Sequence, residues 1–245
     1  MGRGSSKAGG GGGGAAKTPA GMTYDQFMQL SEQERFDKIN EILDNQNIKV
    51  PDYLDSSDTT KLIYALGMDK KPTVVSDAQL DQMQGRELYR TVYETGSMPP
   101  PSTADVIDQI SNGDYTQMSG KGGSAHGRAI YFSTDYGDSA IYGSGERNPL
   151  IMRGKINPTA NIRSESSLGR QMLNDTTWKS TIKQHRLSSS DNIALYALSH
   201  GIDGWYSSTY TMMVNRGALT VSSQAKQIYN SRGSMNRSWA SSPNA

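Results

Sequence analysis

The sequence predicts an α+β fold with a mixed or antiparallel sheet, and two observations support this. Residues 22–68 carry the capping residues and the apolar spacing of short helices. The chain then changes to short β-favouring runs that are separated by Gly, Pro and Ser, with helix candidates between them. Strands and helices do not alternate regularly enough for a doubly wound parallel sheet, so an α+β arrangement fits better.

The chain opens with a Gly-rich stretch over residues 1–21, which predicts a flexible leader. After it, Thr23 and Ser31 are candidate helix caps, and Ser31 followed by Glu34 matches a capping box. A further helix is expected in "DSSDTTKLIYALGMD", with Gly67 as its stop. We therefore expect the leader to be followed by a helical segment.

The remainder of the chain predicts the sheet. Strands are expected in TVV, ELYRTVY, AIYFST, LIMRGKI, GWYSS, YTMMV and ALTVS, and helices in TADVIDQISNG, DYGDSAIYG, SESSLGRQMLND and SDNIALYALSHG. These elements place a main domain over residues 69–222 and a basic flexible tail over residues 223–245.

The composition excludes several functional classes. The chain has no cysteine, which rules out disulfides and thiolate metal sites, and its three histidines are irregularly spaced, so no metal site is expected. No apolar run approaches the length of a bilayer span, so no membrane partner is expected. The sequence also lacks the GxSxG, GxxxxGK[ST] and HExxH motifs.

The formal net charge of +1 conceals an uneven distribution. Residues 1–22 and 223–245 hold six basic residues and no acid; subtracting these six from 25 leaves 19 basic residues against all 24 acidic ones. Solvated tails are the simple explanation. Tails that touch nucleic acid or an acidic partner are the alternative.

The stretch "GRAIYFSTDYGDSAIYG" at residues 127–143 is unusually rich in hydroxyl groups. In a strand, Ile130 and Phe132 would face one side, and Tyr131 and Ser133 the other. One face is therefore apolar, and the opposite face carries hydroxyls that a core does not need. We expect this second face to line a binding cleft.

A helical turn after this strand would place Ser139 and Tyr142 on one face, because they are three residues apart. With Tyr131, this arrangement gives two aromatic rings with a hydroxyl between them. Such a slot suits a flat heteroaromatic group that carries an amide.

The same stretch resembles the nicotinamide-site segment of ADP-ribosyltransferases of the diphtheria-toxin and poly(ADP-ribose) polymerase kind. The resemblance implies that NAD is bound here as a substrate, with Gly127 among the binding residues. It also implies that Tyr131 and Tyr142, eleven residues apart, sandwich the nicotinamide ring. Ser139 would bind its carboxamide, and Ser133 would contact the adjacent ribose.

Further stretches extend the resemblance over about residues 57–222, including "LIYALGMDKKPTVVSD" before the first core strand and "LIMRGKINPTANI" in the middle. "ELYRTVY" is similar to the first core strand of this fold, which makes Arg90 the residue that holds the pyrophosphate; a planar guanidinium suits that task. "GIDGWYSSTYTMMVNRGALTV" resembles the closing strands of phage-encoded ADP-ribosyltransferase-like proteins. The resemblance thus implies an ADP-ribosyltransferase-like core with a helical segment before it.

The sequence departs from the family at the catalytic glutamate that usually opens the penultimate strand. "SSTYTMMV" carries Tyr210 there, flanked by threonines, and no carboxylate. That glutamate stabilises an oxocarbenium-like transition state, as carboxylates do in glycosidases. Without this glutamate, the candidate catalytic residues are Arg90, Ser133 and Tyr210. Transfer of ADP-ribose is therefore expected to be slow or absent.

Three other acids are candidates for the missing carboxylate, namely Glu146, Glu165 and Asp203. Asp203 fits a turn residue before a strand better, and Glu165 fits a charge at a helix N-terminus. The sequence alone does not bring any of them to the sugar.

Each candidate residue also has an ordinary structural explanation. Tyr131 and Tyr142 could pack in a core, and Arg90 could be a surface charge on a strand. His126 beside a glycine fits a loop histidine, and Tyr136 fits a cap on the turn.

The expected function is NAD-dependent ADP-ribosyl transfer to a protein or nucleic-acid acceptor, in the cytoplasm of a phage host during host takeover. The alternative is a non-catalytic phage protein of the same fold that associates with virions or binds a host factor through its basic tails.

Overall fold

The protein is described by a computed structural model covering residues 18–52, 54, 56–68, 70–92, 105, 108, 126–143 and 149–227. Most of the predicted leader, most of the 223–245 tail, most of the helix expected at residues 103–113, and Glu146 lie outside the described residues.

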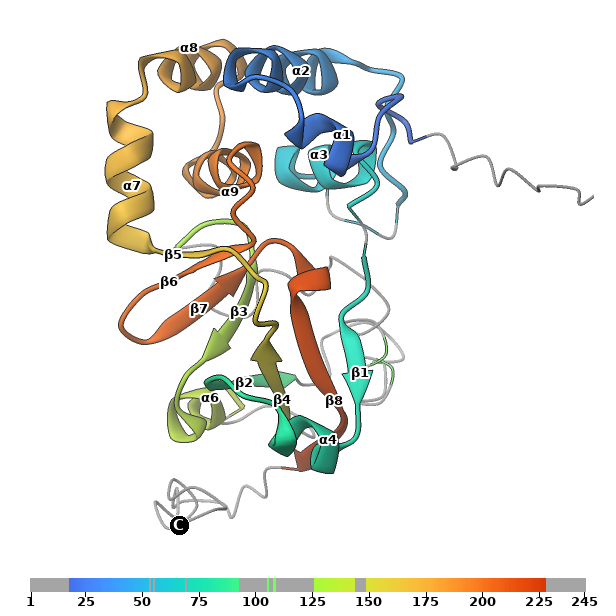
Figure 1. Cartoon of the computed structure of the whole chain (residues 1–245), viewed down its shortest axis with the longest axis vertical. Helices are drawn as coiled ribbons and strands as arrows, with labels where there is room; N and C mark the ends of the chain where they lie inside the picture. The colour runs from blue at the N-terminus through green and yellow to red at the C-terminus, as the bar shows by residue number, and fades with distance from the viewer. Residues whose placement is uncertain are drawn as a thin grey trace, which may run out of the picture.

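Two groups of helices far apart in the sequence gather at one end of the molecule (Figure 1). The first group is α1 (Tyr24–Met28), α2 (Glu32–Asp44) and α3 (Asp58–Ala65), and the second is α7 (Glu165–Asn174), α8 (Thr176–His185) and α9 (Ser189–Ser199). Helix α2 contacts α8 and α9, and α3 contacts α9. The short helices α4 (Asp77–Gln82) and α6 (Tyr136–Ile141) lie at the opposite end of the molecule.

The helix boundaries follow the predicted capping chemistry. Thr23 caps α1, and Ser31 caps α2 in a capping box with Glu34, whose carboxylate accepts from the Ser31 main-chain N–H. After α3 the chain leaves the helix through Gly67, whose φ of +63° lies in the left-handed region. These predictions are confirmed.

Eight strands of the described residues form one sheet in the order β1-β8-β4-β2-β3-β7-β6-β5. They are β1 (Thr73–Val75), β2 (Glu87–Val92), β3 (Ile130–Ser133), β4 (Leu150–Ile156), β5 (Ile162–Ser164), β6 (Gly204–Tyr206), β7 (Tyr210–Met213) and β8 (Leu219–Gln227). The pairs β1–β8 and β5–β6 are parallel and the others are antiparallel. The α+β class with a mixed sheet is thus confirmed.

Four elements differ from the sequence prediction. Strand β5 and helices α4 and α8 were not expected. Strand β5 is only three residues long, and its parallel pairing with β6 holds it in place. Strand β8 also continues past the predicted boundary at residue 222, because residues 225–227 pair with residues 150–152 of β4.

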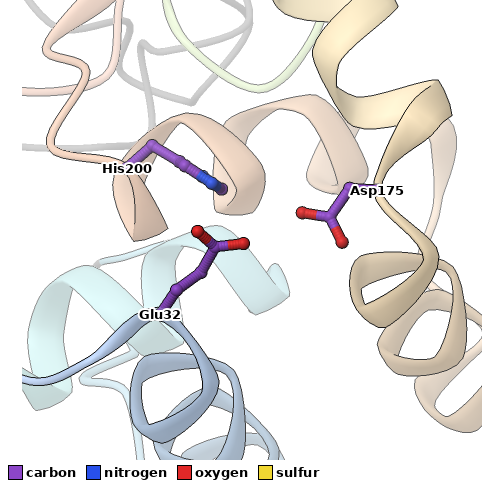
Figure 2. A group of neighbouring side chains, drawn as sticks. All are labelled: Glu32, Asp175 and His200. Carbon is purple, nitrogen blue, oxygen red and sulfur yellow. The ribbon is translucent and has the colours of Figure 1, made fainter.

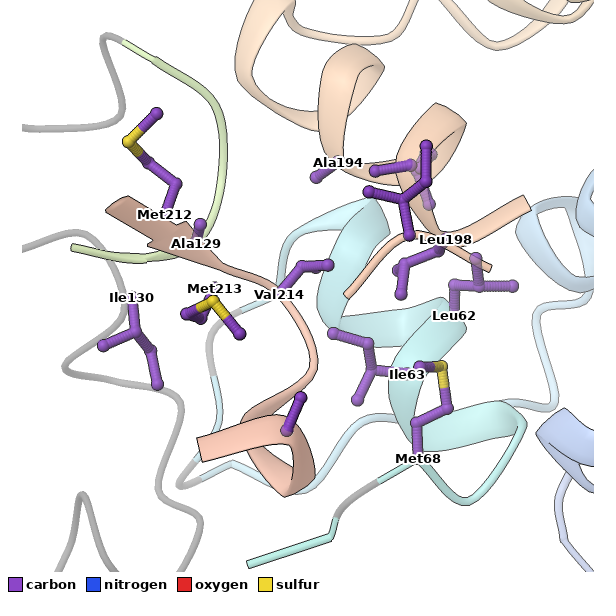
Figure 3. Packing of buried hydrophobic residues seen from close by; sticks show 14 of the residues in the cluster. Leu62, Ile63, Met68, Ala129, Ile130, Ala194, Leu198, Met212, Met213 and Val214 are labelled. Carbon is purple, nitrogen blue, oxygen red and sulfur yellow. The ribbon is translucent and has the colours of Figure 1, made fainter. Parts of the chain in front are cut away.

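One hydrophobic core joins the helices to the sheet. Leu62 and Ile63 of α3 and Leu198 of α9 lie in the same buried cluster as Met212 and Met213 of β7 (Figure 3). The N-terminal helical segment therefore shares its core with the sheet domain.

A buried polar contact reinforces the packing of α3 on α9. Asp191 of α9 accepts hydrogen bonds from the main-chain N–H of Thr59, at 3.1 Å, and from its hydroxyl, at 2.7 Å. Separating the helices would leave these buried groups unsatisfied. Among the described residues, no helix has both the length and the apolar character needed to cross a membrane.

Candidate functional site

Strand β3 shows the two-faced character that its sequence predicts. Ile130 and Phe132 are 3% and 1% exposed and lie in the core. Tyr131, between them, is half-buried and faces the other side of the strand. The chain then turns into α6, whose C-terminal cap is Tyr142. Tyr131 nevertheless packs against the buried hydrophobic cluster, as Tyr210 does, so the core-packing explanation holds for it in part.

A cluster of aromatic rings, which we call the ring cluster, gathers around Tyr210 at the start of β7. The centroid of the Tyr210 ring is 6.5 Å from that of Tyr131, 6.2 Å from that of Tyr142 and 5.9 Å from that of His126. These residues come from β3, β7, the end of α6 and the loop before β3. Tyr210 is the common neighbour of the two predicted stacking tyrosines.

Hydrogen bonds fix the hydroxyls of the ring cluster. Tyr142 and Tyr210 share a short hydroxyl to hydroxyl bond. The Tyr131 hydroxyl donates to the Gly127 carbonyl at 2.6 Å and accepts from the His126 main-chain N–H at 3.0 Å. Burial raises the pKa of both Tyr131 and Tyr142 to about 12, with the bond to Tyr210 adding to the effect at Tyr142. Both hydroxyls therefore stay neutral at physiological pH.

A carboxylate adjoins the ring cluster through His126. The imidazole Nδ1 lies 2.9 Å from one carboxylate oxygen of Glu165 and 3.2 Å from the other, and both side chains are about a third exposed, at 36% and 31%. The Trp205 indole N–H donates to the His126 carbonyl at 2.8 Å, which anchors the loop. Glu165 is the first residue of α7, as a helix N-terminal charge should be, and it also contacts the cluster.

His126 and Glu165 are the residues whose role the sequence obscured. They are 39 positions apart, and no local spacing connects them. His126 does lie in a loop, as its sequence context predicts, but its ring contacts Tyr131 and Tyr210. The available signals were a histidine just before a segment dense in hydroxyls and Glu165 as one of three candidate acids, and nothing in the sequence paired the two.

Gly127 supports the ring cluster through its backbone conformation and its carbonyl group. Its φ is +107°, and a Cβ at this position would overlap the Ile193 side chain and the Trp205 ring. Its carbonyl accepts from Tyr131. Glycine is thus required for the loop to pass close to Trp205 and hold Tyr131.

We expect Gly127→Ala to lower the free energy of unfolding by about 1–3 kcal/mol, because it forces a side chain into a strained conformation and a filled space. Urea denaturation measures this loss. Gly169→Ala in α7 is the matched control, since a Cβ added at Gly169 would meet nothing within 4 Å; it should leave stability equal or slightly higher. Equal effects of the two changes would contradict this account of Gly127.

Arg90 lies where β2 and β3 separate. Within the described residues these strands share one register pair, Tyr89 with Ser133. Arg90 is 6% exposed, and its Nη1 donates to the Tyr131 carbonyl at 2.8 Å. This burial contradicts the surface-charge explanation. The guanidinium thus satisfies the main-chain carbonyl of Tyr131 near the point where the pairing of β2 with β3 ends.

The side of the sheet on which Arg90 lies follows from strand alternation. Tyr89 shares the face of its register partner Ser133, and Tyr131 shares that face too. Thr91 lies on the same side, where its hydroxyl bonds to Ser139. Arg90 therefore leaves β2 on the side opposite the tyrosine rings, which does not favour the pyrophosphate role that the resemblance implies.

The two predicted serines are deeply buried. Ser139 is 2% exposed, with its hydroxyl 3.1 Å from that of Thr91 in β2. Ser133 is 4% exposed and accepts from the main-chain N–H of Asp135, the residue that caps α6. Both hydroxyls hold α6 against the sheet, and their contacts with a ligand remain predictions.

The other candidate residues have structural surroundings. Asp203 accepts from the Asn161 main-chain N–H at 2.8 Å and from the Asn215 side chain at 2.6 Å, which fits its interpretation as a turn residue. The Tyr136 ring packs edge-on against Tyr89, 5.6 Å away. Glu146 lies outside the described residues.

No protein-family model matches the sequence, and comparisons with curated proteins and with solved structures give no match either. The fold and its site define a mixed α+β protein with a cluster of aromatic rings and a carboxylate beside it.

Proposed function

We propose that this protein is an NAD-dependent ADP-ribosyltransferase in which Glu165 takes the part of the glutamate missing from β7. The observation that carries the proposal is the His126–Glu165 pair beside the ring cluster of Tyr131, Tyr142 and Tyr210. It brings a carboxylate next to tyrosines whose sequence resembles a nicotinamide site.

Cleavage of NAD requires a site for the nicotinamide ring and a carboxylate beside the ribose. Nicotinamide leaves when the bond between its ring nitrogen and the ribose breaks, and positive charge then develops on the sugar. A carboxylate beside the sugar stabilises that charge. Glu165 accepts from Nδ1 of His126, since a carboxylate can only accept, and this contact, which reaches both oxygens, would orient the carboxylate while leaving further lone pairs on each oxygen.

Tyr210 acts as a gate in this proposal. It neighbours both Tyr131 and Tyr142, so a nicotinamide that stacked on both rings would take the place of the Tyr210 ring. Opening the gate breaks the hydroxyl bond between Tyr142 and Tyr210 and turns the Tyr210 side chain aside. In this proposal the catalytic role expected for Tyr210, which stands where the family has its glutamate, is replaced by control of entry.

The proposal is tested by incubating the purified protein with NAD labelled in the nicotinamide and, separately, in the adenylate. Release of free nicotinamide measures cleavage, and label on macromolecules of a bacterial lysate measures transfer. We expect slow release with transfer to a protein or nucleic-acid acceptor. Absence of both, at protein concentrations well above any contaminating enzyme, would reject the proposal.

Arg90 provides a separate prediction. Because it is buried and faces away from the rings, we expect Arg90→Lys to lower the melting temperature and to change NAD affinity by less than about threefold, which is under 1 kcal/mol. Calorimetry and thermal unfolding give the two quantities. A tenfold loss of affinity at unchanged stability would restore the pyrophosphate role, since a lysine cannot reproduce a bidentate contact.

A further inference from the structure

Three metal-binding side chains meet at the helical end of the molecule, away from the ring cluster. Glu32 begins α2, Asp175 joins α7 to α8, and His200 follows α9. Each offers one ligand atom, and these atoms all lie within 4.8 Å of one another. Figure 2 shows the two carboxylates and the imidazole directed toward a common space.

The imidazole of His200 is prepared for coordination by a contact outside this trio. Its Nδ1 lies 2.8 Å from the Tyr196 carbonyl, which can only accept, and 2.9 Å from the Ser199 hydroxyl, which itself donates to that carbonyl, so Nδ1 carries the proton. Neutral His200 therefore keeps a lone pair on Nε2. A histidine that binds a metal through one nitrogen commonly donates from the other to a main-chain carbonyl in this way. The Tyr196 ring, 4.1 Å from the imidazole, restrains its orientation.

Excess negative charge marks the same place. Glu32 and Asp175 each bring a carboxylate oxygen to within 4.8 Å of the other's, beside the imidazole of His200. Asp175 already accepts from the Trp178 main-chain N–H through one oxygen. A cation between the two carboxylates would offset their mutual repulsion.

We propose that Glu32, Asp175 and His200 form a divalent-metal site that takes zinc, or an ion with the same preference for nitrogen and oxygen ligands, and that fastens α2 to the α7–α8 junction and to the end of α9. One imidazole and two carboxylates are a common donor set for such ions, with water in a fourth position. The site is independent of the proposed transferase activity.

Closing the site requires a small movement. Zinc bonds of about 2.0–2.2 Å place neighbouring tetrahedral ligand atoms roughly 3.4 Å apart, so the three ligand atoms must draw together somewhat. Glu32 is exposed and can supply this movement. Local spacing in the sequence predicts no metal site, because tertiary packing brings these three residues together from positions 32, 175 and 200.

The test is a calorimetric titration of the full-length, metal-free chain with zinc chloride, combined with thermal unfolding. We expect one zinc ion to bind per chain and the melting temperature to rise with zinc concentration, since a ligand that binds the native state stabilises it. Glu32→Gln should weaken zinc binding about tenfold or more and leave the metal-free protein folded, because the side chain is exposed. His200→Gln should have the same effect on affinity.

Glu41→Gln is the matched control, because Glu41 is an exposed glutamate of the same helix that pairs with Lys38 instead. It should bind zinc like the unaltered chain. The proposal is overturned if no saturable binding occurs, or if Glu32→Gln binds zinc normally. It is also overturned if Glu165→Gln, and not Glu32→Gln, removes binding, since the ion would then occupy the His126–Glu165 pair.

Discussion

Glu165→Gln should slow the release of nicotinamide from NAD by about 10²- to 10³-fold, the usual cost of removing one group that stabilises charge in a transition state. The glutamine keeps the shape of the side chain, and its amide oxygen can still accept from His126. NAD affinity and melting temperature should therefore change little. Single-turnover release of labelled nicotinamide separates the chemical step from binding.

Asp203→Asn is the matched control for this experiment. Asp203 is also a carboxylate near the end of the sheet, but its oxygens are used by Asn161 and Asn215 in a turn. Its replacement should cost stability and leave the rate per folded molecule unchanged. Full activity of Glu165→Gln would instead show that the carboxylate lies elsewhere, with Glu146 as the remaining candidate from the sequence.

The position of Glu165 depends on an element that the sequence did not reveal. Strand β5 pairs in parallel with β6, with Ser164 opposite Tyr206, and α7 begins at the next residue. Tyr206, the pairing partner of Ser164, lies two residues after Gly204. A Cβ added at Gly204 would collide with the Met212 carbonyl of β7. The close approach of β6 to β7 thus brings the start of α7 to the ring cluster.

Local physical chemistry was enough to predict many of the elements. Capping side chains at Thr23 and Ser31 and the left-handed exit at Gly67 are determined by the residues within one turn. The alternation in β3 is equally local, because Ile130 and Phe132 must face the core together.

The arrangement of the site residues could not be predicted from any short stretch of the sequence. The faces of β2 and β3 are related by a single register pair, so the side on which Arg90 emerges could not be predicted from either strand alone. The contact between His126 and Glu165 likewise depends on β5, which is too short to show a period. The sequence pattern therefore pointed to the tyrosines as candidate site residues. The positions of Arg90, His126 and Glu165 relative to them depend on tertiary pairing.

Tyr142→Ala should weaken NAD binding by about 10- to 100-fold, because it removes one of the two rings that stack on nicotinamide in the proposed site. Tyr142→Phe should bind nearly normally, since it keeps the ring and loses only the hydroxyl bond to Tyr210. Fold stability should change less than affinity, as Tyr142 is only partly buried at the end of α6. Calorimetric titration with NAD and thermal unfolding measure the two effects.

Tyr210→Ala should act in the opposite direction on affinity. If the Tyr210 ring occupies the place that nicotinamide takes, its removal spares the ligand the cost of turning that ring aside, about 0.5–1.5 kcal/mol for a displaced rotamer, and affinity should rise up to roughly tenfold. A core role for the ring cluster makes a different prediction, because Tyr142→Ala and Tyr210→Ala would then both lower the melting temperature and leave NAD binding unchanged. Opposite signs in the two variants are therefore the signature of a gated stacking site, and loss of affinity in both would make Tyr210 a wall of the site that stays in place when NAD binds.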